Sequence, residues 1–386
     1  MKKVLSLVLA AVMTAAMFAG CADKKDSGST AGAGNTIKVG SSGPMTGGNA
    51  VYGLAVANGL ELAFEEINAK GELQFELRTE DDEADPGKGV NAYNTLMDWG
   101  MQIMAGPTTS GVSLAVAAEC VEDSVFMLTP SGSDPFIIET GDNIFQICFS
   151  DPNQGIGSAD YIKEHNLGTK IGVIYDSSSG YSNGIYEKFM ARAKENGQNV
   201  VTAEAFTEDN KSDLSSQVSK CQAAGCDLVF MPIYQGEAAQ VLTYANKIGY
   251  QPKFVGCDGM DGILTLKNFD KSLAEGLILL TPFDATAEDE ATRNFVKKYT
   301  EKYGDTPNQF AADSYDVAYA IYESCKATGV TADMTAEEIS EKLQSHFPSM
   351  TFSGLTGENM TWEETGAVSK YPKAVEIQNG VYVGIQ

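Results

Sequence analysis

The chain has 386 residues, of which 52 are acidic and 27 are basic, so its formal net charge at pH 7 is −25. This length predicts about two domains, and the hydrophobic fraction of 43% is ordinary for a globular protein. A surface this acidic repels polyanions, so the charge excludes nucleic acid from the expected partners and predicts a well-solvated surface.

Residues 1–20 have the pattern of a signal peptide: a positively charged start, then the apolar run VLSLVLAAVMTAAMFAG, which is too short to span a bilayer comfortably. Ala19 and Gly20 stand directly before Cys21, an arrangement that resembles a bacterial lipobox. We therefore expect lipidation of Cys21 and a flexible tether over residues 21–35 that holds the protein at the outer face of a membrane. Ordinary secretory cleavage, without a lipid, is the alternative.

From residue 36 on, short apolar runs alternate with helical patterns. The runs that predict strands are TIKVGSS (36–42), MQIMAGP (101–107), VFMLTPS (125–131), KIGVIYD (170–176), CDLVFMPI (226–233), KFVGCDG (253–259) and GLILLTPF (276–283). Helices are expected over residues 51–70, 86–99, 110–121, 155–166, 181–197, 212–224 and 236–249. This rhythm predicts an α/β fold with parallel sheets, because parallel strands need helical crossovers that cover both faces of the sheet.

Three segments are candidates for crossings between two lobes. They are FQICFSD (145–151), LLTPFDAT (279–286) and TFSGLTGENMTWEE (351–364). Three crossings make two lobes from discontinuous segments, with a cleft between them. We expect one lobe from residues 36–150 and 283–351, and the other from residues 151–282 and 352–386.

Most motifs of common enzymes and metal sites are missing from the sequence. His165 and His346 stand in no metal or nucleophile motif, and there is no phosphate loop or C-x-x-C, although GYSNG (180–184) fits the short pattern G-x-S-x-G. The acidic cluster at residues 80–85 does not match the EF-hand template, so we interpret it as a strand end followed by a helix start. We therefore expect neither catalysis nor a cofactor, and we expect the six cysteines besides Cys21 to be free thiols, with disulfides as the open alternative.

Small and hydroxyl residues follow several predicted strands, at the edge where open α/β sheets bind ligands. Ser110, Ser131 and Ser133 lie in GPTTSGVS and TPSGSDP, near the expected starts of helices. Hydroxyls and free backbone N–H groups at a helix start form a site for a carboxylate, although each serine could equally serve as a helix cap.

The second half of the chain places different chemistry after its strands. Asp258 suits a ligand ammonium, and the rings of Tyr181 and Tyr234 suit an apolar side chain. A lobe that binds carboxylate and faces a lobe that binds ammonium describes a receptor for an α-amino acid.

From about residue 36 to its end, the chain resembles the Leu/Ile/Val-binding proteins. These are the periplasmic binding proteins of branched-chain amino acid ABC transporters. The matching blocks are IKVGSSGPMTGGNAVYG, AFEEINAKG, DDEADPGKGVNAYN, MLTPSGSDP, SDPNQG, DLVFMPIYQGEAAQVL, FVGCDG and LTGENMTWEETGA. The resemblance implies a type I periplasmic binding protein fold, in which two Rossmann-like lobes with parallel sheets are joined by a hinge of three segments. It also implies an ABC permease as partner, no cofactor or metal, and a monomer.

The resemblance assigns roles to individual residues. Ser110 matches a hydroxyl that binds the ligand carboxylate, and Asp258 matches the acid that binds the ammonium. Tyr52 matches an aromatic side chain that we expect at the mouth of the cleft, as part of a lid over the ligand's apolar tail. The full expected ligand-binding set is Tyr52, Ser110, Ser131, Gly132, Ser133, Tyr181, Tyr234 and Asp258. Asp258 stands where the family commonly has glutamate, and Ser133 where it has threonine, so the side-chain specificity stays open.

The expected function is therefore capture of an α-amino acid, first of all Leu, Ile or Val, outside the cytoplasm, and its delivery to an ABC permease. Three alternatives stay open at this point: a receptor of the same fold for an amide, urea-like or aromatic ligand; a ligand sensor for a membrane receptor; and a surface hydrolase with a carboxylate pair.

Overall fold

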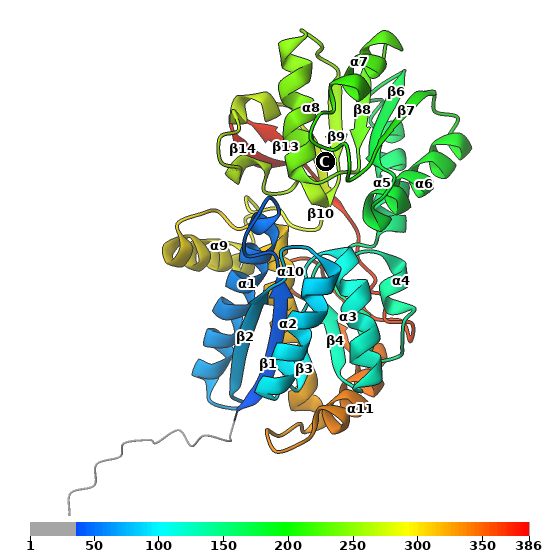
Figure 1. Cartoon of the computed structure of the whole chain (residues 1–386). Coiled ribbons are helices and arrows are strands. Elements are labelled where there is room, and N and C mark those ends of the chain that lie inside the picture. The colour runs from blue at the N-terminus through cyan, green and yellow to red at the C-terminus, as the bar shows by residue number, and fades with distance from the viewer. Residues whose placement is uncertain (1–35, 386) are drawn as a thin grey trace, which may run out of the picture. The chain divides into compact units, whose positions relative to one another are not determined.

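The computed structural model describes residues 36–385, and two separate sheets form its framework (Figure 1). The first sheet has the strand order β2-β1-β3-β4-β5, and all its neighbouring strands are parallel. Its strands are β1 (Ile37–Gly43), β2 (Phe75–Asp81), β3 (Ile103–Met104), β4 (Phe126–Thr129) and β5 (Ile144–Gln146).

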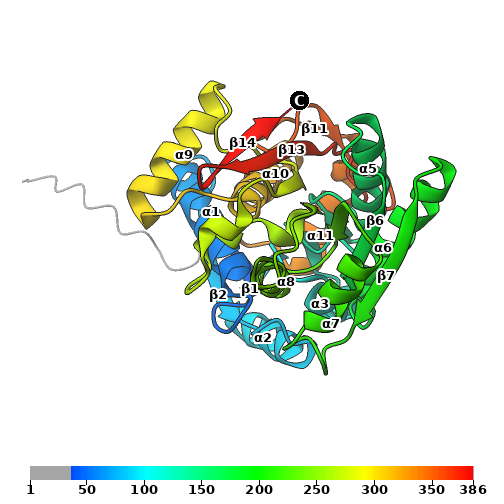
Figure 2. The ribbon, with the colours of Figure 1, turned by 90° about the horizontal axis from the view of Figure 1, so that it is seen from above.

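The second sheet has the order β14-β13-β10-β9-β8-β6-β7. Its strands are β6 (Ile171–Asp176), β7 (Val200–Phe206), β8 (Leu228–Met231), β9 (Lys253–Gly256), β10 (Ile278–Thr281), β13 (Lys373–Gln378) and β14 (Val381–Ile385). Strands β6 to β10 are parallel, whereas β13 and β14 form an antiparallel pair at the edge, side by side in red in Figure 2. A short ribbon, β11 (Thr351–Phe352) with β12 (Met360–Thr361), completes the strands of this part of the chain.

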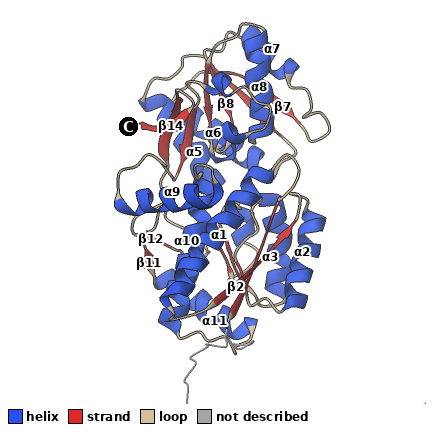
Figure 3. Ribbon diagram, turned by 90° about the vertical axis from the view of Figure 1, so that its left-hand side faces the viewer, coloured by secondary structure: helices blue, strands red, loops and turns tan. Residues whose placement is uncertain are grey.

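Helices cover both faces of each sheet (Figure 3). The α-helices are α1 (Ala50–Lys70), α2 (Pro86–Trp99), α3 (Ser110–Glu122), α4 (Pro135–Ile138), α5 (Asp151–Glu164), α6 (Gly180–Glu195), α7 (Ser215–Ala223), α8 (Gln235–Lys247), α9 (Glu290–Tyr303), α10 (Gln309–Thr328) and α11 (Ala336–His346). Successive residues of β4 show why the first sheet needs a layer of helices on each of its faces. Phe126 and Leu128 pack with α1 and α10, while Met127 between them packs with α2 and α3, because side chains alternate across a strand.

Local sequence signals set the ends of the helices. The carboxylate of Asp85 accepts a 2.9 Å hydrogen bond from the N–H of Lys88, and Pro86 occupies the first turn of α2. The same helix ends at Gly100, whose φ of 91° is accessible to glycine at little cost. The acidic cluster is thus the end of β2 and the start of α2, which confirms the interpretation made from the sequence.

The chain crosses between the sheets three times. It leaves the first sheet after β5, and it returns after β10, since Phe283 already belongs to the core around β1 and β4. The last crossing differs from the expected one. Phe352, Met360 and Trp362 also belong to that first core, and the chain joins the second sheet only at β13. From this packing we propose that the last boundary between the lobes lies in the segment 369–372 and not at residue 351.

All seven helices expected between residues 51 and 249 are present, with ends that differ by a few residues. Helices α9, α10 and α11 were not anticipated, because no strand separates them and the strand–helix rhythm stops there. Within residues 36–385, no helix is both long and apolar enough to span a bilayer, and six cysteines are buried and free. The predicted signal peptide, the lipidated Cys21 and the tether lie outside the described residues.

Candidate functional site

The candidate site lies where both sheets reverse their strand order. In the first sheet β1 lies between β2 and β3, and in the second β6 lies between β7 and β8. Connections that leave such neighbouring strands in opposite directions open a crevice beyond their carboxyl ends. The first turns of α1, α3 and α6, which follow β1, β3 and β6, supply Tyr52, Ser110 and Tyr181. Tyr234 is the N-cap residue of α8 after β8, and Asp258 follows β9.

The start of α3 forms one side of this site. Thr109 is the N-cap residue, yet its hydroxyl caps no N–H group, and this buried oxygen has no hydrogen-bond partner within residues 36–385. Ser110 accepts a 3.2 Å hydrogen bond from the N–H of Ser133, and the two serine hydroxyls lie 3.5 Å apart. Uncapped N–H groups at the start of a 13-residue helix, with hydroxyls beside them, form a binding site for an anion.

Asp258 forms the opposite side. It begins the short 3-10 helix η1 (Asp258–Met260) after β9 and is 6% exposed. The hydroxyl of Tyr181 donates a 2.6 Å hydrogen bond to its Oδ1, and its own N–H donates to Oε1 of Gln154. Burial raises the pKa of Asp258 to about 7, although the hydrogen bond from Tyr181 lowers it. A pKa this high shows that the neighbouring groups do not fully stabilise the charged form of the buried carboxyl. A ligand cation beside it would favour that charged form.

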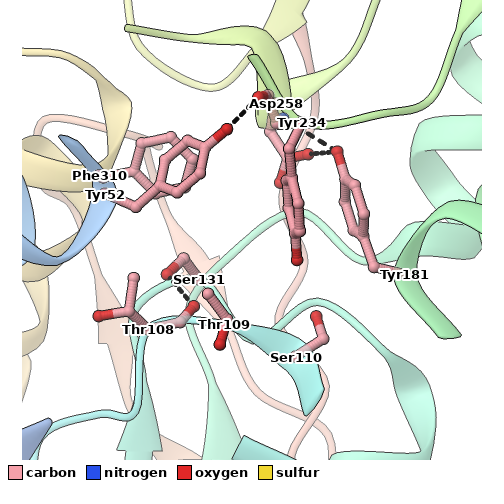
Figure 4. A pocket seen from close by; sticks show the side chains of 10 residues that line it. Tyr52, Thr108, Thr109, Ser110, Ser131, Tyr181, Tyr234, Asp258 and Phe310 are labelled. Carbon is pink, nitrogen blue, oxygen red and sulfur yellow. Dashed lines mark hydrogen bonds between the residues drawn. The ribbon is translucent and has the colours of Figure 1, made fainter. Parts of the chain in front are cut away.

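Aromatic rings form the rest of the wall (Figure 4). Tyr181 and Tyr234 stack with their ring centroids 4.9 Å apart, and the ring centroid of Tyr52 lies 4.8 Å from that of Phe310 and 5.5 Å from that of Tyr234. These rings make the space between α3 and Asp258 apolar along its sides. The site therefore offers an anion subsite, a cation subsite and an apolar wall.

These groups enclose one small pocket of about 260 Å³. Six residues of the expected set line it: Tyr52, Ser110, Ser131, Tyr181, Tyr234 and Asp258. Gly132 and Ser133 lie behind this lining. A side chain on Gly132 would collide with Ser113 and Thr129, and Ser133 contacts Ser110.

Four other residues that line the pocket were not predicted from the sequence, namely Thr108, Thr109, Gly259 and Phe310. Thr108 and Thr109 directly precede Ser110, and Gly259 directly follows Asp258, so their neighbours could have indicated them. Gly259 is needed here, because a Cβ atom at this position would collide with the hydroxyl of Tyr181. Phe310 lies on α10, far from the predicted strand ends, and no signal in the sequence indicated it.

The two sides of the site are bonded to each other. The hydroxyl of Tyr52 donates to the carbonyl of Gly259 at 2.5 Å and accepts a 3.0 Å hydrogen bond from the N–H of Gln235. A second link joins the N–H of Gln309 to Oδ2 of Asp261 at 2.8 Å. Tyr52 is thus 1% exposed and bridges the two sides, whereas the sequence analysis expected it at the mouth of the cleft.

The charged groups around the pocket are mainly acidic. Asp151 is fully buried, and neither of its carboxylate oxygens has a hydrogen-bond partner in the described part of the chain. Burial raises its pKa, and the charge of Asp258 raises it further. Between residues 36 and 385, no cluster of histidine, cysteine or acidic side chains is arranged to hold a metal ion. The local field therefore favours a cation over an anion near Asp258.

Comparisons with known proteins identify the class of the fold. The profile of the periplasmic binding protein family matches residues 36–380. The Leu/Ile/Val-binding protein homolog 3 of Brucella melitensis is 28% identical over 338 residues, which are 86% of this chain and 89% of that protein. The Leu-, Ile-, Val-, Thr- and Ala-binding protein of Pseudomonas aeruginosa is 27% identical over 344 residues, 88% of this chain and 89% of the relative.

A solved structure agrees with these relatives. The branched-chain amino acid transporter substrate-binding protein LivJ of Streptococcus pneumoniae, in complex with isoleucine, superposes with a TM-score of 0.81. It is 25% identical, and the match covers 91% of this chain and 100% of that one. The chain belongs to the periplasmic binding protein family, and its fold is the expected α/β arrangement of two lobes joined by a three-segment hinge.

Proposed function

We propose that this protein captures an α-amino acid, first of all leucine, isoleucine or valine, outside the cytoplasm and delivers it to an ABC permease. The observation that carries the proposal is the opposition of two subsites across one small pocket. The uncapped start of α3 with Thr109 and Ser110 holds the ligand carboxylate, and Asp258 holds the ammonium. Only a ligand that bears both charges satisfies both subsites at once.

The apolar wall determines which ligand side chains fit the site. Tyr52, Tyr234 and Phe310 offer ring faces and edges, which bury aliphatic carbon without requiring a hydrogen bond from it. The two charged subsites line one pocket together with these rings, an arrangement that suits a small ligand with two charged groups and an apolar side chain. The names of the Brucella and Pseudomonas relatives and the isoleucine bound to LivJ support the same ligand class.

Binding works by closure of the two lobes about the hinge. The ligand first docks on one lobe, and the bonds of Tyr52 and of Asp261 form when the other lobe closes over it. Such closure is a shift between open and closed states that the ligand favours by its contacts with both lobes. The closed form presents a joint surface to the permease. The protein works as a monomer, performs no catalysis and needs no cofactor, and lipidated Cys21 anchors it to the membrane.

A thermal-shift panel tests this proposal. The purified protein is freed of carried-over ligand by partial unfolding and refolding, and its melting is measured with each of the twenty common amino acids. A ligand that binds only the folded state raises stability by mass action. We expect the largest rise with Leu, Ile and Val. A panel without any rise would contradict the proposal and would favour the amide or sensor alternatives.

A further inference from the structure

A second, larger chamber adjoins the ligand pocket. Its volume is about 1270 Å³, part of which is open to solvent, and loops at the carboxyl ends of both sheets form its walls. Three residues, Thr109, Tyr181 and Tyr234, line the chamber as well as the pocket. A ligand between α3 and Asp258 therefore lies next to this chamber.

Acidic groups dominate the charges of the chamber. Its carboxylates are Glu83, Asp85, Asp176, Glu208 and Glu237, and its one lining cation is Lys211. Most of these acids already have close partners. Glu83 pairs with Lys88 at 2.6 Å, and Glu208 pairs with Lys211 at 2.7 Å. Asp176 accepts hydrogen bonds from the N–H and hydroxyl of Ser178.

Glu237 is the exception among these carboxylates. Its side chain is only 15% exposed, and in the described part of the chain its single ionic partner is Lys211 at 3.9 Å. Lys211 lies much closer to Glu208, so it compensates Glu237 weakly. Burial raises the pKa of Glu237, whereas its own backbone N–H in the first turn of α8 and, to a smaller extent, Lys211 lower it. A carboxylate that is largely removed from water without a close cation is costly, and a bound cation would offset that cost.

Two further observations connect Glu237 with the ligand. Burial raises the pKa of Tyr234, and the charges of Asp258, Asp151 and Glu237 raise it further, so Asp258 and Glu237 act on the same wall residue. Thr109, which is 7% exposed, carries a hydroxyl without a partner within residues 36–385 and lines both spaces. The subsite that holds the ligand carboxylate therefore borders the chamber.

We propose that Glu237 forms a second cation subsite, so that the protein also binds amino acids whose side chains end in an amino or guanidino group. Lysine and ornithine are the simplest examples. This inference rests on the proposed function, because the α-ammonium and carboxylate of such a ligand occupy Asp258 and the start of α3. The side chain then extends past Tyr234 into the chamber, where its terminal cation pairs with Glu237.

Calorimetric titration of the ligand-free protein with lysine, norleucine and leucine tests the inference. Lysine and norleucine share a straight four-carbon side chain, but only lysine carries the second cation. We expect Glu237→Gln to weaken lysine about tenfold, as the loss of about 1.4 kcal/mol implies, while norleucine and leucine change less than about twofold. Lys211→Met removes the competing cation and should strengthen lysine binding.

Glu83→Gln is the matched control, because Glu83 lines the same chamber but pairs with Lys88 instead of Lys211, and its side chain is 50% exposed. It should leave the lysine-to-norleucine ratio unchanged. Binding of leucine without any binding of lysine would overturn the inference and leave the proposed function intact. Equal weakening of lysine and leucine by Glu237→Gln would also overturn it, because Glu237 would then act on the fold. If no amino acid binds at all, both proposals fail.

Discussion

The hydroxyl of Tyr181 donates a 2.6 Å hydrogen bond to Oδ1 of Asp258 and accepts one of 2.9 Å from the N–H of Gly259. Tyr181 comes from α6 and Asp258 from the loop after β9, so two separate elements fix the position of this carboxylate. A neutral hydroxyl orients the charge without cancelling it. Asp258 is therefore preorganised for a cation that the ligand brings.

Asp258→Asn keeps the shape of this side chain and removes its charge. We expect leucine to bind about 2–5 kcal/mol more weakly, because the ligand ammonium loses its charged partner in a site shielded from water. Titration calorimetry of the ligand-free variant and of the unchanged protein measures the difference. An unchanged dissociation constant would remove Asp258 from the site.

The same substitution should stabilise the protein when no ligand is bound. The pKa of Asp258 is about 7 in the folded protein, above its ordinary value of 3.8. Folding therefore favours the protonated form, and the stability that this contributes is complete below about pH 4 and lost as the pH rises through about 7. The Asp258→Asn variant has no such loss, because its amide does not titrate. The ligand-free variant should exceed the unchanged protein at pH 8 by up to about 4 kcal/mol, at 1.36 kcal/mol per pKa unit.

Denaturant unfolding at several pH values tests this stability prediction. The difference between the two proteins should shrink steadily from pH 8 towards pH 4. A difference that stays constant over this range would show that the charge of Asp258 is not its source. The opposite effects of one substitution on affinity and on stability are typical of a functional site.

Tyr52→Phe separates the two roles of Tyr52. The substitution keeps the ring against Phe310 but removes the hydroxyl that bonds Gly259 and Gln235. We expect leucine binding to weaken by about 1 kcal/mol, because the closed state loses two hydrogen bonds and leaves two backbone groups unpaired. Tyr52→Ala removes the wall as well, so leucine should lose more affinity than alanine. Equal losses for both ligands, measured by calorimetry, would contradict a wall at Tyr52.

A buried ion pair near the last crossing predicts a large effect on stability. Nζ of Lys370 lies 2.6 Å from Oδ1 of Asp313 and 2.6 Å from the hydroxyl of Thr356, and both charged side chains are nearly unexposed. Lys370→Met leaves Asp313 buried without its cation, so the free energy of unfolding should fall by about 3–5 kcal/mol. The double variant Lys370→Met/Asp313→Leu should recover most of this loss. Urea unfolding measures the free energy of unfolding of both variants. A decrease of less than about 1 kcal/mol in the Lys370→Met variant would show that this ion pair is not a large contributor to stability.

The strand–helix rhythm could be predicted from the sequence because parallel strands are apolar on both faces and their loops are rich in glycine and hydroxyls. Ser110, Tyr234 and Asp258 follow such strands directly, and a rule about the carboxyl ends of strands was enough to group them. Phe310 reaches the pocket from α10, which packs along α1 only after the chain has crossed back from the second sheet. No local pattern carries that information.

The last crossing between the two sheets could not be placed from the sequence either. The segment 351–364 contains short strands, polar turns and Trp362, and these features fit either lobe. Its place was decided by packing: Trp362 contacts Phe347 and Phe352 and donates a hydrogen bond to the carbonyl of Gln146. The partners Phe347 and Gln146 lie outside this segment, and Gln146 is far away along the chain, so only the folded structure could reveal that the segment covers the first sheet.

The most direct test of the account removes one charged group of the ligand at a time. The ligand-free protein is titrated with leucine, with isocaproate, which lacks the ammonium, and with isoamylamine, which lacks the carboxylate. Each loss leaves one buried subsite unpaired, so we predict that both analogues bind at least about a hundredfold more weakly than leucine. If isocaproate or isoamylamine binds as tightly as leucine, the pocket between α3 and Asp258 is not an amino-acid site.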